Sequence, residues 1–237
     1  MLPVMRDAAT GLYHRRTDTL ILREGVYDNV PIEPDDVVLD LGAHIGSASW
    51  LFLEKGARQA ICIEADPENM PLLKRNLRGR RATILWAAVA EKAGNADFYT
   101  RADRRYVGSL TPDEGRKRVR VATVPFAGLL KQFRPTVVKC DIEFGEYGLP
   151  WTLPDHVRTV AMEVHIRYAG VFNRIITTDE LRENRERASD LMASIEAQGF
   201  REHWRKDKQA KPGEPRAGAD RSSLGPMTKC VCVTWVR

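Results

Sequence analysis

No apolar run in this sequence is long enough to cross a membrane. The longest ones, such as residues 37–41 and 157–164, are broken by charged or polar residues well before the about 20 apolar residues that a membrane-spanning helix needs. The first ten residues include Pro3, Arg6 and Asp7 and lack the continuous apolar stretch of a secretory signal. We therefore expect no transmembrane helix, no membrane partner and a cytoplasmic location.

Cysteine is scarce, and its spacing does not indicate a metal or redox motif. No two of the four cysteines have the CxxC spacing of a zinc or redox site. Each lies in an apolar, strand-like run, so we expect buried free thiols. They are Cys62, Cys140, Cys230 and Cys232.

The excess of positive charge is small. Lys and Arg number 37 against 32 Asp and Glu, a net charge of +5, which is compatible with acidic partners such as nucleic acid but does not require them. Hydrophobic residues make up 43% and charged residues 29%, which suits a folded core with a solvated surface rather than global disorder. A length of 237 residues suits one α/β domain with a modest extension.

The chain divides into a short N-terminal part and one long α/β region. Residues 1–35 are mixed and turn-prone, with a β-like segment at 19–22, and we interpret them as an N-terminal extension or cap. From Asp36 to residue 237, β-rich runs alternate with helical segments, the pattern of βαβ units and a mostly parallel sheet. We expect strands at 37–41, 60–63, 82–85, 96–99, 119–124, 136–142, 159–166, 200–204 and 229–236, and helices at 47–55, from Asp66 to Gly79, at 126–133 and at 178–198.

The last helix and the loop that follows it are strongly polar. Thr177 and Glu180 form a capping-box pattern that predicts the start of the helix at 178–198. The helix is heavily charged, and we interpret it as a solvated outer face that gives no indication of an oligomeric state. A long loop at 207–228, rich in Lys, Arg, Gly and Pro, is typical of a functional or mobile connection.

The first strand runs into a turn that suits a ligand at the edge of a sheet. Residues 37–41 end in Asp40 and Leu41, and Gly42 and Gly46 follow with three residues between them, not the GxGxxG spacing that holds a pyrophosphate. Asp40 would face a cationic ligand, and Glu64, at the end of the second strand, would accept both ribose hydroxyls. S-adenosylmethionine carries an ammonium and a sulfonium and no phosphate, so it fits this pattern. The alternatives are a turn-capping acid at position 40 and an exposed strand-end acid at position 64.

A second group of acids follows two later strands. Alternation along a strand places Asp141 and Glu143 on one side, and it places Glu163 and His165 on one side of the next strand. An alcohol needs a positioned base before it can accept a methyl group, and Asp141, Glu143 and His165 are the candidates. The same residues would alternatively form a structural network with Arg104, Arg105 or Lys139, or hold a hard cation such as magnesium. We assign no metal ligand from the sequence.

These two segments resemble the FkbM family of S-adenosylmethionine-dependent methyltransferases. The Asp-x-Gly-Ala-Asn/His-x-Gly turn of that family is similar to residues 40–46, and its Lys-x-Asp-x-Glu-Gly-x-Glu segment to residues 139–146, except that Phe144 stands in place of the glycine and Gly145 follows it. The resemblance covers about three quarters of the chain. It implies a Rossmann-like, doubly wound and mostly parallel sheet with an antiparallel C-terminal strand, the architecture of class I methyltransferases.

The resemblance also implies a reaction. It implies O-methylation of a small-molecule acceptor, such as a secondary metabolite or a sugar, with S-adenosylmethionine as cofactor. The residues predicted to bind the cofactor are Asp40, Gly42, His44, Gly46, Glu64 and Ala65, and those predicted to act on the acceptor are Asp141, Glu143 and His165.

Two other functions compete with this one. RNA methylation is the second choice, because basic stretches at 101–105 and 116–120 could contact phosphates, although a solvated charged face is the commoner explanation. A module that binds the cofactor without catalysis is the third.

Overall fold

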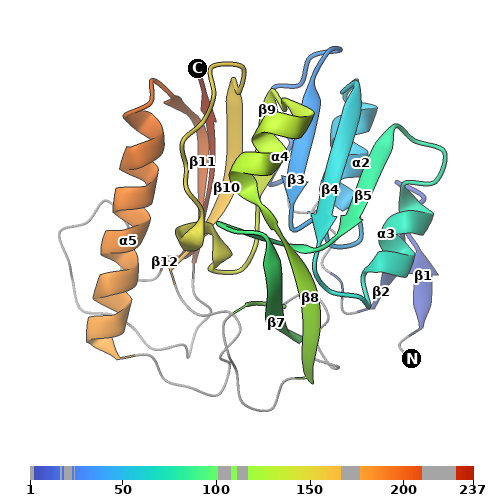
Figure 1. Cartoon of the computed structure of the whole chain (residues 1–237). Helices are drawn as coiled ribbons and strands as arrows, with labels where there is room; N and C mark the ends of the chain where they lie inside the picture. The colour runs from blue at the N-terminus through green and yellow to red at the C-terminus, as the bar shows by residue number, and fades with distance from the viewer. Residues whose placement is uncertain are drawn as a thin grey trace.

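Seven strands form one large sheet at the centre of the protein (Figure 1). The computed structural model describes residues 3–16, 18, 23, 25–100, 108–110, 117–166, 177–209 and 228–237, so the predicted β-like segment at 19–22 lies outside the described residues. The strand order is β11-β12-β10-β9-β3-β4-β5. The strands are β3 (Val37–Leu41), β4 (Gln59–Glu64), β5 (Ala82–Trp86), β9 (Val137–Cys140), β10 (Thr159–His165), β11 (Arg201–Gln209) and β12 (Thr228–Val236).

The sheet confirms the predicted Rossmann-like α/β fold. Strands β5, β4, β3, β9 and β10 are parallel to one another, and β12 pairs antiparallel with β10, as expected for the C-terminal strand. All five residues of β3 are buried, which explains why this strand is a continuous apolar run apart from Asp40.

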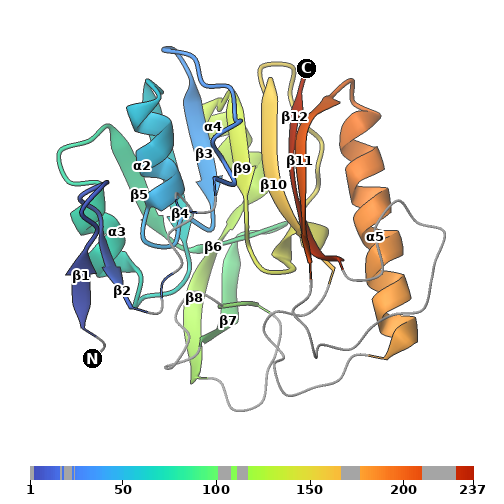
Figure 2. The same ribbon diagram turned by 180° about the vertical axis from the view of Figure 1, so that it is seen from behind.

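Helices cover both faces of the sheet. Helices α4 (Phe126–Phe133) and α5 (Thr178–Glu196) lie on one face (Figure 1), and α2 (Ser47–Glu54) and α3 (Met70–Asn76) lie on the other (Figure 2). The larger apolar core lies between the sheet and the α4–α5 layer. None of the helices in the described part of the chain is long and apolar enough to span a bilayer.

The helix predicted to open at Asp66 begins later. Asp66 Oδ1 accepts a hydrogen bond from the Glu68 amide, and its Oδ2 accepts one from Thr100 Oγ1, so Asp66 closes a turn instead of capping a helix. Helix α3 starts at Met70, with Pro71 in its first turn. The predicted start was therefore wrong by about one helical turn, because Asp66 has a tertiary partner on a distant strand.

A second sheet and a hairpin lie beyond the carboxyl ends of the parallel strands (Figure 1). The second sheet has the order β6-β8-β7, with β6 (Ala88–Ala90), β7 (Gly94–Thr100) and β8 (Lys117–Pro125). The hairpin consists of β1 (Val4–Arg6) and β2 (Tyr13–Arg15), and it is tied to α3 by hydrogen bonds between Tyr13 and Asn76. The strands β6, β1 and β2 were not predicted, because three residues are too few for a periodic pattern. Whether residues 1–35 form a separable cap stays a prediction.

The C-terminal elements confirm one prediction and correct two. The capping box is present, with the Glu180 amide donating to Thr177 Oγ1 and the Thr177 amide donating to Glu180 Oε2. Helix α5 is not solvated on all sides, because it is amphipathic and Arg185 is only 2% exposed. The predicted loop at 207–228 is shorter than expected, since β11 continues to Gln209 and β12 begins at Thr228. The residues between them lie outside the described part.

Candidate functional site

The site lies where the strand order reverses. From β3 the chain proceeds to β4 and β5 on one side of the sheet, whereas β9 and β10 lie on the other side of β3. In open α/β sheets, ligands bind in the crevice at the carboxyl ends of the two strands that flank such a switch point. Here the switch point lies between β3 and β9, and the segments that follow these two strands are the turn at residues 42–46 and the loop at residues 141–148.

The backbones of these two segments are in direct contact. A Cβ placed on Gly42 would lie 1.9 Å from the carbonyl oxygen of Asp141, and the φ angle of Gly42 is +77°. The Asp141 amide donates to the carbonyl of Leu41 at 3.0 Å. At Gly46 the φ angle is +89°, and a Cβ would lie 2.9 Å from the side-chain atom Leu73 Cδ1. Both glycines therefore permit close packing of the chain on itself.

Asp40 lies behind the turn and is not exposed. Its carboxylate accepts a hydrogen bond from Ser49 Oγ at 2.6 Å and forms an ion pair with Lys139 Nζ at 2.9 Å. Lys139 Nζ also donates to the carbonyl of Gly42 at 2.7 Å. Burial lowers the pKa of Lys139, but the charges of Asp40 and Asp141 outweigh it and raise this pKa above its usual value. Asp40 and Lys139 therefore hold the turn in place, which is the structural alternative weighed for position 40, and direct contact of Asp40 with a ligand stays a prediction.

Glu64 ends β4 beside the turn, as predicted. Its Oε2 accepts from the His44 amide at 2.7 Å, and its Oε1 accepts from the Asp66 amide at 2.7 Å and from Asn69 Nδ2 at 3.2 Å. Burial raises the pKa of Glu64, while His44 and the Asp66 amide lower it. Ala65 follows, and its carbonyl accepts from the indole of Trp86 at 3.0 Å.

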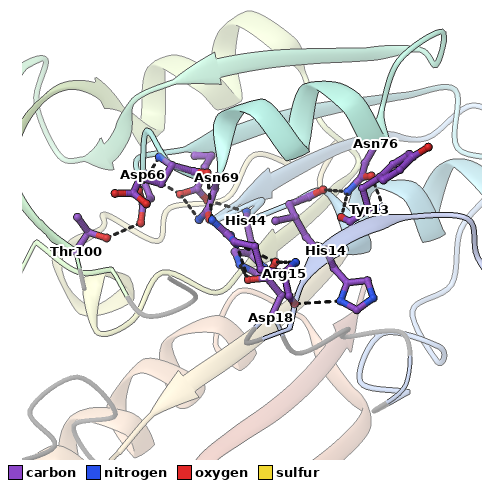
Figure 3. A network of polar contacts seen from close by, with 12 residues as sticks. Tyr13, His14, Arg15, Asp18, His44, Asp66, Asn69, Asn76 and Thr100 are labelled. Carbon is purple, nitrogen blue, oxygen red and sulfur yellow. Dashed lines mark hydrogen bonds and ion pairs between the residues drawn. The ribbon is translucent and has the colours of Figure 1, made fainter. Parts of the chain in front are cut away.

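A polar network connects this part of the site to the N-terminal residues (Figure 3). Arg15 donates to Asp18 from Nε and to Asn69 Oδ1 from its guanidinium, and Asn69 in turn bonds Glu64. His44 Nε2 lies 3.6 Å from Asp18 Oδ1, which closes the ring of contacts. Burial would raise the pKa of Asp18, but His44 and Arg15 lower it to about 2. Arg15 and Asp18, from the predicted N-terminal extension, therefore support the part of the site next to Glu64. The composition of residues 1–35 did not indicate this contribution.

On the other side of the turn, carboxylates surround the imidazole of His165. His165 Nε2 lies 3.8 Å from Asp141 Oδ1, 3.5 Å from Glu143 Oε2 and 3.7 Å from Glu163 Oε1. These residues meet because strands β9 and β10 are adjacent in the sheet. We call Asp141, Glu143, Glu163 and His165 the acid–imidazole cluster.

The reason given for Asp141 and Glu143 sharing a side was wrong. Strand β9 ends at Cys140, so strand alternation does not apply beyond it. Instead, Glu143 and Phe144 both have positive φ angles, +50° and +72°, and this turn directs the Glu143 carboxylate back to His165. Burial raises the pKa of Glu143 to about 7, although the charge of His165 lowers it.

A fourth carboxylate holds His165 from behind. Glu146, in the short 3-10 helix η1 (Gly145–Gly148), is fully buried, and its Oε1 lies 3.0 Å from His165 Nδ1 and accepts from the His165 amide at 2.8 Å. Burial alone would lower the pKa of His165, but Glu146 and Glu143 raise it well above its usual range. The segment that matches the FkbM pattern therefore supplies Glu146 as a support for His165.

Phe144 occupies a backbone conformation that favours glycine, which is the residue that the family has there. Its ring lies 5.7 Å from the His165 ring and 6.0 Å from the Tyr147 ring. A left-handed conformation costs a residue with a side chain about 1–2 kcal/mol. The turn therefore holds Phe144 in a left-handed conformation, with its ring next to His165 of the cluster.

Two thiols and one hydroxyl border the same cluster. Cys230 Sγ donates to Glu163 Oε1 at 2.9 Å, and Cys232 Sγ lies 3.6 Å from Glu163 Oε2. All four cysteines are buried free thiols, as predicted. Tyr27, 2% exposed, packs in an apolar cluster with Ala161 and Cys232. A lone Tyr in a mixed N-terminal segment gives no sequence signal for this position.

Two of the described basic residues in the predicted phosphate-binding stretches form surface ion pairs. Arg118 Nη1 and Arg120 Nη1 on β8 lie 3.4 and 3.3 Å from the carboxylate of Asp97, with both arginine side chains more than 60% exposed. This is the solvated charged face that we considered the commoner explanation. Residues 101–105, and with them Arg104 and Arg105, lie outside the described residues.

Comparison with known proteins identifies the fold. No family model and no curated protein matches the chain. A solved structure from Listeria monocytogenes, described as a "putative S-adenosylmethionine dependent methyltransferase", is 10% identical, with 90% of this chain and 96% of that chain covered and a TM-score of 0.50. The chain therefore shares its Rossmann-like α/β fold with this structure.

Two further solved structures are similar at lower TM-scores. The C-terminal domain of precorrin-6Y C5,15-methyltransferase from Rhodobacter capsulatus is 12% identical, with 99% of this chain and 94% of that chain covered and a TM-score of 0.48. TYW2 from P. horikoshii, in complex with MeSAdo, is 14% identical, with 98% and 71% covered and a TM-score of 0.49.

Proposed function

We propose that this chain is an S-adenosylmethionine-dependent methyltransferase of the FkbM type that methylates a hydroxyl group of a small molecule. The observation that carries the proposal is the presence of acids on both sides of the switch point. Glu64 lies on the β4 side, and the acid–imidazole cluster lies on the β9–β10 side. The buried cation of the crevice, Lys139, is bonded to Asp40 and to the carbonyl of Gly42. These charges favour a cationic nucleoside over a phosphate-bearing one.

The donors and acceptors near Glu64 fit the nucleoside part of this cofactor. A carboxylate has about four lone-pair positions, and three donors use those of Glu64: the amides of His44 and Asp66 and the side chain of Asn69. One position, on Oε2, remains for a ribose hydroxyl. The turn at residues 42–46, with Gly42, His44 and Gly46 at positive φ, would border the same ligand.

The acid–imidazole cluster suits the acceptor. S-adenosylmethionine supplies a methyl group bound to a sulfonium, and the acceptor oxygen must lose its proton as it takes this group. Asp141, Glu143 and His165 are the residues of this chain that can accept that proton. The protein's larger contribution is to hold the acceptor in line, which in well-oriented systems is worth about 7–11 kcal/mol.

Two observations support the finer parts of the proposal. Arg118 and Arg120 are exposed and share the single carboxylate of Asp97, as on a solvated charged face, so we favour a small-molecule acceptor over RNA. The four free thiols are typical of a protein of the reducing cytoplasm. The fold of the Listeria structure supports the class of reaction by analogy only.

Calorimetric titration with S-adenosylmethionine tests the proposal, with NAD as the competing ligand. We expect saturable binding of S-adenosylmethionine, weakened about 10- to 100-fold in Glu64→Gln, because a hydrogen bond to a charged group contributes about 1.5–3 kcal/mol. Glu54→Gln, which removes an exposed acid of α2, is the matched control and should bind normally. Binding of NAD instead, or equal binding by both variants, would reject the assignment. A methylation assay on extracted small molecules and on RNA at rising salt then separates the acceptors, because RNA binding falls steeply with salt.

A further inference from the structure

Three atoms of types that bind metals converge at the carboxyl ends of β9 and β10. One oxygen each from Asp141 and Glu163 and one nitrogen of His165 all lie within 4.8 Å of one another. Measured from His165 Nε2, the two oxygens are 3.8 and 3.7 Å away. A tetrahedral ion with ligands at about 2.1 Å keeps those ligands about 3.4 Å apart. Both distances from Nε2 are within a few tenths of an ångström of that separation.

His165 is held in the orientation that metal-binding histidines have. Its Nδ1 lies 3.0 Å from Glu146 Oε1, so this ring nitrogen is committed to a buried carboxylate. Metal-ligating histidines almost always bond a carboxylate, carbonyl or water through the second ring nitrogen, which fixes the ring and its tautomer. In this chain the arrangement leaves Nε2 directed at the carboxylates of Asp141, Glu143 and Glu163.

The hydroxyl of Tyr27 is an independent sign of a missing ligand. Tyr27 is 2% exposed, and its Oη has no hydrogen-bond partner among the described residues. Tyr27 belongs to the same apolar cluster as Ala161 and Cys232, which lie on the face of β10 and β12 that carries Glu163. Burial raises the pKa of Tyr27, and the charges of Asp141 and Glu163 raise it further, so the side chain lies within electrostatic reach of the cluster. A buried hydroxyl without a partner is rare, and a water bound to an ion would satisfy it.

We infer that Asp141, Glu163 and His165 bind one divalent transition-metal ion, with Zn²⁺ as the ion that fits best. Imidazole favours zinc and its neighbours over magnesium, and the separations match a tetrahedral site better than the shorter ones of an octahedral site. Glu143 Oε2 lies 3.5 Å from Nε2 but outside the group of three mutually close ligand atoms, so a water would be the fourth ligand. Metal binding by the chain alone does not depend on the proposed methyl transfer. If that function holds, the ion would bind the acceptor hydroxyl and lower its pKa.

The test is titration of the chelator-treated full chain with ZnCl₂, followed by calorimetry. We expect one ion per chain, with affinity reduced at least 10-fold in Asp141→Asn and in Glu163→Gln. Glu146→Gln, which alters only the support of His165, should weaken binding by about 10- to 100-fold. Asp97→Asn, on β7 away from the cluster, is the control and should bind as the unaltered chain does.

The neighbouring thiols are the competing zinc ligands, and a second variant tests them. The double change of Cys230 and Cys232 to Ser should leave the affinity for zinc within a few-fold of the unaltered chain. Loss of binding in this variant, with binding retained in Asp141→Asn, would overturn the inference in favour of a thiolate site. Co²⁺ bound to the unaltered chain gives the same distinction without any variant, because thiolate ligands produce an intense charge-transfer absorption and oxygen and nitrogen ligands do not.

Titration with S-adenosylmethionine, with and without zinc, separates this inference from the proposed function. Zinc binding that is lost in the ligand variants supports the metal site even if S-adenosylmethionine does not bind. Binding of S-adenosylmethionine by a chain that takes up no zinc would overturn the metal site and leave the methyltransferase assignment in place.

Discussion

Lys139 on β9 and Asp40 on β3 form an ion pair that water does not reach. Nζ and Oδ1 are 2.9 Å apart, and the two side chains are 1% and 0% exposed. The two residues are register partners on adjacent parallel strands, so the pair spans the switch point of the sheet. Lys139 also donates to the carbonyl of Gly42. The buried ion pair is therefore hydrogen-bonded to the turn that borders the proposed cofactor site.

Removing one partner of this pair should lower the free energy of unfolding more than removing both. Lys139→Met leaves the Asp40 carboxylate buried without its cation, and breaking a buried pair in this way costs about 3–5 kcal/mol. Adding Asp40→Asn to Lys139→Met removes the remaining charge and keeps the hydrogen bond with Ser49. We expect the double variant to be more stable than Lys139→Met in urea unfolding at neutral pH.

The exposed pair of Arg80 and Glu54 is the control for this cycle. Glu54→Gln should change the free energy of unfolding by less than about 1 kcal/mol, as is usual for surface pairs. Additive effects of Lys139→Met and Asp40→Asn would show that the two groups do not stabilise each other.

Gly42 is expected to tolerate no side chain. In Gly42→Ala, the new Cβ meets the carbonyl oxygen of Asp141 at 1.9 Å, and the residue keeps a positive φ angle. The conformational cost of about 1–2 kcal/mol and a steric cost of about 1–3 kcal/mol add, so we expect a loss of about 2–5 kcal/mol in thermal or urea unfolding.

Gly56→Ala isolates the conformational part of that loss. Gly56 also has a positive φ angle, +105°, but nothing lies within 4 Å of the position that a Cβ would take there. This variant should lose only about 1–2 kcal/mol. Equal losses at the two positions would mean that the contact with Asp141 does not constrain the turn.

The stabilising effect of Asp18 should disappear in acid. Its pKa is about 2 in the folded chain against 3.8 ordinarily, so the ionised form stabilises the fold above pH 3.8 and this effect is lost as the pH falls through about 2. At neutral pH, Asp18→Asn should lose about 2 kcal/mol of unfolding free energy, since one pKa unit corresponds to about 1.4 kcal/mol.

The difference between Asp18→Asn and the unaltered chain should narrow between pH 4 and pH 2 in urea unfolding. Asp35→Asn, at an exposed turn position, should show no comparable difference at any pH in this range. A difference in unfolding free energy that stays constant with pH would mean that Asp18 acts through packing and not through its charge.

The sequence indicated the central strands of the large sheet, such as β3, β4 and β10, because each is mostly apolar and buried. It also indicated the position of the acid–imidazole cluster, since the carboxyl ends of adjacent parallel strands must meet at one edge. The hydrogen-bond and ion-pair partners of the site residues were not predictable, because tertiary contacts determine them. Asp40 meets Lys139 only after β3 and β9 pair, and β9 stops at Cys140 because the turn after β3 packs against Asp141. The N-terminal contributions of Arg15, Asp18 and Tyr27 had no periodic pattern to reveal them.

Phe144, which lies next to the acid–imidazole cluster, should tolerate glycine better than alanine. Its φ angle of +72° is unfavourable for any residue with a Cβ. Phe144→Ala loses the ring contacts with His165 and Tyr147 and keeps the unfavourable backbone, whereas Phe144→Gly loses the ring and relieves the backbone. Glycine relieves the unfavourable backbone conformation but loses more conformational entropy on folding. On balance we expect Phe144→Gly to be more stable than Phe144→Ala by about 1 kcal/mol in urea unfolding.

At Glu186, an exposed position inside α5, the order should reverse, with alanine more stable than glycine by about 1 kcal/mol. The same order at both positions would show that the turn after β9 relaxes when the ring is removed, and that the left-handed conformation of Phe144 is held by its ring and not by the backbone contacts of the turn.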